Sequence, residues 1–121
     1  MSPERTPAKQ GFAVLVKELG DRPGVEIPGL LGRPARRFGS SALLTHGRIF
    51  AMLSQGRLVL KLPARRVAEL IGSGVGSAFD AGKGRPMREW VGLDVARHDV
   101  WLALAAEAMD FVAAAAPPGR R

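Results

Sequence analysis

The chain has 121 residues, a formal net charge of +7 and no cysteine. This length predicts one domain that can bury a core without metals or disulfides, and the lack of cysteine excludes thiol catalysis and thiolate metal sites. The cysteine usage is compatible with a reducing cytoplasm, where we expect the protein to act. The charge favours a polyanionic partner such as DNA, although solvated surface cations explain it equally well.

The N-terminal third predicts one helix between irregular segments. Residues 1–9 are expected to be disordered, and residues 10–115 to form a single domain. Phe12, Leu15, Val16 and Leu19 follow the spacing of an amphipathic helix over 10–19, which Gly20 ends. Residues 21–34 hold three prolines and three glycines, which predicts a loop with at most a short edge strand.

Residues 38–62 predict a three-stranded antiparallel meander. His46-Gly47 and Gln55-Gly56 each interrupt an apolar run with two residues, the second a glycine that can take positive φ. Turns of this length set the register, so Thr45 is expected opposite Arg48, and the positions beyond follow in steps of one. The same rule places Ser54 opposite Arg57.

Strand alternation then divides the meander into two faces. One face is wholly apolar and is the predicted core face, with Ala42, Leu44, Ile49, Ala51, Leu53, Leu58, Leu60 and Leu62. The other carries Leu43, Phe50, Met52 and Val59 beside Ser41 and Lys61. Either another element of the chain covers this second face, or it is a contact surface for a second copy or a protein partner.

The remaining elements complete an α+β fold, in which helices pack against an antiparallel sheet of about four or five strands. Pro63 is expected at the first position of a short helix that ends at Gly72, with Arg65 and Arg66 outward and Val67, Leu70 and Ile71 inward. Residues 72–84 are glycine-rich and predict a loop with a short strand near 77–80. Residues 87–93, anchored by Trp90, predict a last strand. Asp99 is the expected N-cap of a helix over 100–115, followed by a disordered basic tail at 116–121.

No catalytic or metal-binding arrangement is evident in the sequence. The glycine-rich loop follows a helix, and Gly84 stands where a Walker-type loop needs Ser or Thr, so a nucleotide cofactor is not expected. His46 and His98 have no partner at ligand spacing. Asp80 and Glu89 lie near the glycine loop, and a pocket around Asp80, Arg85, Glu89 and Trp90 is the basis of a third hypothesis, a small-molecule enzyme. We therefore expect a non-enzymatic protein without metal or cofactor. We also expect no membrane span, because the most apolar tract, 100–116, contains Glu107 and Asp110.

Basic residues gather at predicted loops and turns, where they could lie along a phosphate backbone. The candidate nucleic-acid-binding residues are Arg36, Arg37, Arg48, Arg57, Lys83, Arg85 and Arg88. The 63–71 helix, with Arg65 and Arg66 outward, is the one small candidate for reading bases. The alternative function is a dimerisation or protein-interaction module that uses Leu43, Phe50, Met52 and Val59.

Five segments of the chain follow one another in a recognisable order: Phe38-Gly39, the run from Gly47 to Met52, the run from Arg57 to Lys61, the run from Gly82 to Met87, and the closing helix around Trp101 and Phe111. In this order they resemble the TfoX N-terminal domain and the related YjbR/MmcQ-like proteins. The resemblance covers residues 36–113 and implies a small α/β domain in a regulatory DNA-binding protein, without a catalytic residue set. The resemblance does not extend to the helical C-terminal domain of full-length TfoX, which we expect to be missing, and His46 stands before Gly47 where the family tends to have an acid or asparagine.

Overall fold

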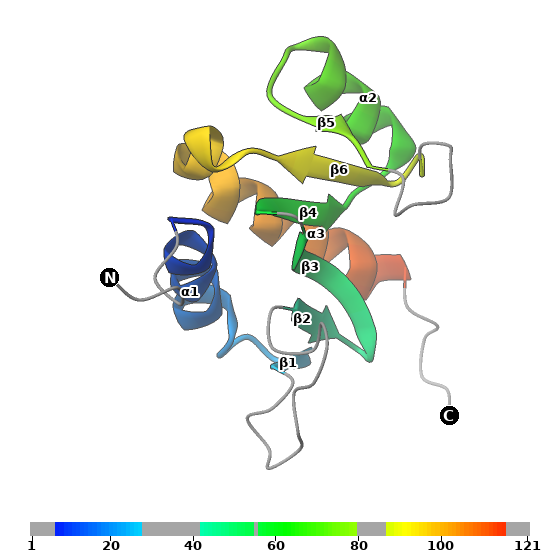
Figure 1. Cartoon of the computed structure of the whole chain (residues 1–121). Coiled ribbons are helices and arrows are strands. Elements are labelled where there is room, and N and C mark those ends of the chain that lie inside the picture. Colours follow the sequence, from blue (N-terminus) through cyan, green and yellow to red (C-terminus); the bar gives the residue numbers. More distant parts are fainter. Residues whose placement is uncertain (1–6, 28–41, 55, 80–86, 116–121) are drawn as a thin grey trace.

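The structure, a computed structural model, describes residues 7–27, 42–54, 56–79 and 87–115. Within these ranges the chain forms a six-stranded antiparallel sheet with the strand order β1-β2-β3-β4-β6-β5 (Figure 1). The strands are β1 (Val25–Glu26), β2 (Ala42–Thr45), β3 (Arg48–Ser54), β4 (Arg57–Lys61), β5 (Ser77–Ala78) and β6 (Trp90–Leu93). The helices are α1 (Pro7–Leu19), α2 (Ala64–Gly72), the 3₁₀ segment η3 (Val95–Val100) and α3 (Trp101–Ala115). The predicted α+β class is confirmed.

Helices α1 and α3 pack against each other and against the central strands, and this layer forms the core (Figure 1). The buried side of α1 carries Phe12, Leu15 and Leu19, as its spacing predicted. Gly11 lets the two helices approach closely, because a Cβ there would lie 2.8 Å from the ring of Trp101. Helix α1 begins at Pro7, so residues 7–9, predicted to be disordered, are helical.

The two predicted turns shape the meander. His46 and Gly47 have φ values of 53° and 79°, the pair of positive φ angles that a type I′ hairpin turn requires. Gly56, in the second turn, has φ of 78°. The β3–β4 register agrees with the prediction from Ser54↔Arg57 to Ala51↔Leu60.

The β2–β3 register departs from the prediction after its second pair. Thr45↔Arg48 and Leu44↔Ile49 are as expected, but Leu43 then lies opposite Ala51, since Phe50 is an extra residue in a β-bulge. Residues directly opposite each other share a face. Leu43 therefore lies on the face of Ala51 and Leu60, and Phe50 belongs to the same core cluster with α1 and α3.

The bulge corrects the predicted faces. Leu43, Phe50 and Val59 have no exposed surface. The prediction that they form an exposed contact surface with Met52 is therefore wrong. Leu43 and Phe50 are covered by the helices, whereas Val59 is buried on the opposite face. Ala42, assigned to the core face, instead lies opposite Met52, in a row that crosses the sheet through Val59, Gly92 and Ser77.

Smaller differences concern the ends of elements. Pro63 is the N-cap of α2 rather than its first residue, and Ile71, expected to point inward, is 40% exposed. Asp99, the expected N-cap of the last helix, instead lies within η3. The N-cap of η3 is Asp94, whose side chain accepts a hydrogen bond from the backbone N–H of Ala96. The predicted short strand near 77–80 is present as β5, at the edge of the sheet beside β6.

Because of the bulge, Leu43 is buried in the core, whereas the adjacent Leu44 lies outside the core cluster. We expect Leu43→Ala to lower the free energy of unfolding by about 2–5 kcal/mol, because it leaves a cavity in the core. The matched change Leu44→Ala, at a half-buried position outside the core cluster, is expected to cost about 1 kcal/mol or less. Urea denaturation of both variants measures the difference. A larger loss for Leu44→Ala would contradict the bulge.

Candidate nucleic-acid interface

Three of the seven predicted nucleic-acid-binding residues lie in the described part of the chain. Arg48 is exposed at the start of β3, Arg57 is half-buried at the start of β4, and Arg88 is exposed just before β6. The other four fall outside the described residues, namely Arg36, Arg37, Lys83 and Arg85.

The strand registers place Arg48 and Arg57 at opposite ends of the sheet. Arg48 begins β3 and Arg57 pairs with Ser54 at its other end. A strand of this length spans about 20 Å. Lys61 pairs with Trp90, which places Arg88 at the same end as Arg48. The three cations therefore do not form one patch, and Arg57 is the one that stands apart.

Arg57 is also occupied within the fold. Its Nη1 donates a hydrogen bond of 2.7 Å to the hydroxyl of Ser77. The guanidinium lies over Gly92, where a Cβ would come within 2.9 Å of Nη1. The side chain thus joins β4 to the edge strand β5 across the surface of β6, which gives it a structural role.

At the Arg48 end of the sheet, the last turns of α3 meet β3 and β4 around a groove of about 780 Å³. Charged or polar side chains at the groove come from Arg48, Lys61 and Glu89. Its apolar walls come from Ile49, Met52, Trp90, Phe111, Val112 and Ala115. The sequence pattern indicates no site role for Lys61 or Phe111, because the four segments that line the groove, at residues 47–52, 61, 89–90 and 111–115, come together only in the folded chain.

Lys61 is held in this groove by two interactions. Its Nζ lies 3.3 Å from a carboxylate oxygen of Glu89 and 5.3 Å from the centre of the Trp90 ring. The ammonium is therefore largely neutralised by its acidic neighbour, and it also rests on the indole. Arg48, by contrast, has no hydrogen bond or ion pair within the described residues, so its charge is available to a ligand.

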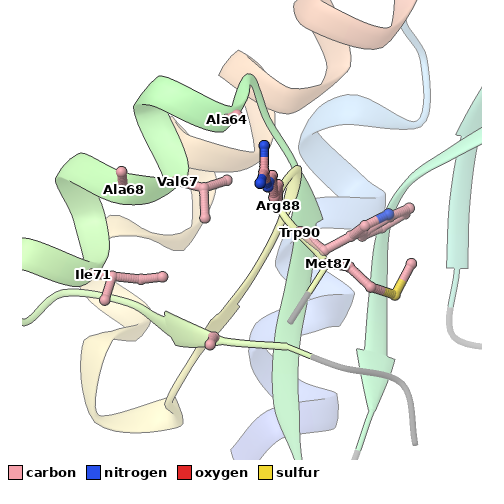
Figure 2. A pocket seen from close by; sticks show the side chains of 8 residues that line it. Ala64, Val67, Ala68, Ile71, Met87, Arg88 and Trp90 are labelled. Carbon is pink, nitrogen blue, oxygen red and sulfur yellow. The ribbon is translucent and has the colours of Figure 1, made fainter. Parts of the chain in front are cut away.

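A second, smaller hollow of about 260 Å³ lies between α2 and the strands β5 and β6. Figure 2 shows Val67 and Ile71 of α2 on one side of it, with Met87 and Trp90 on the other. Arg88 is its one charged lining residue among those described. Trp90 lines both hollows and so separates Arg48, in the groove, from Arg88.

The predicted base-reading helix does not present both of its arginines. Arg65 is exposed, but Arg66 binds both carboxylate oxygens of Glu107 on α3, with Nε–Oε1 and Nη2–Oε2 distances of 2.9 and 3.1 Å. It also binds Glu69 at 3.2 Å. The hydrogen bonds to Glu107, and then to Glu69, raise the pKa of the Arg66 guanidinium above its ordinary value. Arg66 thus fastens α2 to α3.

The residues considered for catalysis lie apart. His46 occupies the β2–β3 turn, His98 is exposed in η3, Glu89 is paired with Lys61, and Asp80 falls outside the described residues. Within residues 7–27, 42–54, 56–79 and 87–115, no three His, Asp or Glu side chains gather as metal ligands would. In the same ranges, none of the helices has both the length and the apolar character that crossing a bilayer requires.

A scan against protein-family models, a search of curated proteins and a search of solved structures each found no match for this chain. What the chain does is therefore inferred from its own residues.

The Arg66–Glu107 pair predicts different roles for neighbouring arginines. Arg66→Ala should lower the free energy of unfolding by about 0.5–1 kcal/mol, a modest loss because both partners are partly exposed and screened by solvent. Arg65→Ala removes the same charge from an exposed position and should change stability by less than about 0.5 kcal/mol. Urea denaturation compares them, and equal losses would argue against the link between α2 and α3.

Proposed function

We propose that this protein is a non-enzymatic nucleic-acid-binding module that holds phosphates at the Trp90 end of its sheet. The observation that carries the proposal is the position of Arg48 and Arg88. Both are exposed, both lack an acidic partner among the described residues, and they lie on either side of Trp90. Phosphate contacts need only positive charge and reach, and both side chains have these.

Two further arguments favour this function. The formal charge of +7 raises the local concentration of a polyanion and speeds encounter. The segments that resemble the TfoX N-terminal domain are consistent with a regulatory DNA-binding role, and the lack of cysteine is compatible with the reducing cytoplasm. The proposed footprint is narrower than the one that the sequence predicted, since Arg57 is bonded to Ser77 at the far end of the sheet.

A duplex-binding experiment tests the role of these two arginines. We expect the double variant Arg48→Glu/Arg88→Glu to bind a labelled mixed-sequence duplex at least about tenfold more weakly at low salt. The slope of its log affinity against log salt concentration should become shallower by the contribution of about two phosphate contacts, because each contact releases condensed counterions. Fluorescence anisotropy at several salt concentrations measures both quantities.

The matched control uses two other exposed cations. Arg97→Glu/Lys17→Glu makes the same change of charge in η3 and α1, and η3 lies at the opposite end of α3 from the groove. It should lose less affinity than the Arg48/Arg88 variant, through the change in net charge alone. Equal losses would mean that only net charge matters, and salt-independent binding by the wild type would overturn the proposal.

The ion pair between Lys61 and Glu89 predicts a variant that binds DNA more tightly than the wild type. Glu89→Gln removes the counter-charge of Lys61 and should tighten DNA binding severalfold at low salt, since the groove then carries two free cations. Glu18→Gln makes the same change of charge on the exposed surface of α1 and serves as the control. If both variants gain the same affinity, Lys61 does not lie in the footprint.

A further inference from the structure

The groove has the size and lining of a ligand site. Its volume of about 780 Å³ lies within the range of about 300–1,000 Å³ that is common for small-molecule pockets, whereas the hollow beside α2 is smaller. Its walls are mainly apolar and include two half-buried aromatic rings, Trp90 and Phe111, contributed by β6 and α3. An apolar, aromatic interior of this size suits a planar ring.

The charged residues of the groove indicate which charged group its ligand should carry. Lys61 is paired with Glu89 inside the groove, so these two nearly cancel. Arg48 remains as the one lining charge without an acidic partner in the part of the chain that the structure describes, and it stands at the exposed start of β3. The matching ligand therefore has a flat apolar body and a negative group at the mouth of the groove.

An unpaired nucleotide has both parts. In a duplex the bases are stacked and paired inside the helix, so their faces cannot reach a groove on a protein surface without being flipped out. In a single strand the bases are free to leave the stack and to lie against aromatic side chains, while basic residues follow the phosphates. A groove that takes up a base would thus distinguish single strands from duplexes, which phosphate contacts alone do not distinguish.

We propose that the groove receives an unpaired base of single-stranded nucleic acid, which lies against the indole of Trp90 while Arg48 binds the adjacent phosphate. The base takes the place of the Lys61 ammonium over the indole, and Glu89, which stays paired with Lys61 through one carboxylate oxygen, offers the other oxygen to an N–H group of the base. This inference rests on the proposed function, and it adds that the protein prefers single strands.

The decisive comparison uses two oligomers with the same phosphates. One is a thymidine decamer, and the other is a decamer of abasic sites with an identical backbone. We expect the thymidine decamer to bind about fivefold to a hundredfold more tightly, which is the affinity that base stacking supplies. We also expect it to quench the fluorescence of Trp90. Trp101 is 1% exposed and so contributes little to quenching by a bound base.

The variant Trp90→Leu should abolish the difference between the two oligomers, with circular dichroism confirming its fold. Quenching of the wild type requires no variant, and it remains informative if Trp90→Leu does not fold. Equal, salt-sensitive binding of both decamers would overturn base insertion and leave phosphate binding intact. Binding of neither decamer at low salt would overturn the proposed function as well.

Discussion

The β-bulge at Phe50 is the constraint on which the rest of this fold depends. One extra residue in β3 places Phe50 and Ala51, which are consecutive, in the core beneath α1 and α3, and it turns Leu43 toward the same helices. Without it, strict alternation would leave Leu43 and Phe50 on the outer face, and the helices would lose two of their largest fully buried contacts. Buried leucines of this kind are each worth a few kcal/mol, so the bulged register is strongly favoured over the regular one.

Hydrogen bonds and ion pairs within the fold decide which cations remain for a partner. Arg57 is bonded to Ser77, Arg66 to Glu107, and Lys61 to Glu89. Each of these interactions also joins elements that are distant in sequence, so these side chains hold β5, α3 or the β4–β6 pair in place. A charge that serves the fold in this way is a poor ligand for phosphate, because binding would first have to break an internal contact. The formal charge of +7 therefore overstates the binding surface.

Much of the fold could be predicted from sequence, because local signals agree with tertiary structure in most elements. The spacing of Phe12, Leu15 and Leu19 specifies α1, and glycine at the second turn position specifies both hairpins. The bulge could not be predicted, since residues 49–53 are all apolar and fit either face. The site was predicted least well. Arg48 and Arg88 were found as cations, but the roles of Trp90 and Phe111 depend on contacts among four separate segments.

The same bulge connects the core to the groove. Helix α3 can approach β3 because Phe50 and Ala51 face it, and its last turns then supply Phe111 and Val112 to the groove wall. The facing wall is set by the pairing of Lys61 with Trp90, which follows from the uninterrupted β4–β6 register. A regular strand in place of the bulge would change which side chains of β3 face α3. It would therefore also change the part of the groove wall that Ile49, Met52 and Phe111 form together. The shape of the binding site is therefore a consequence of how β3 packs, rather than a surface feature that could vary independently of the core.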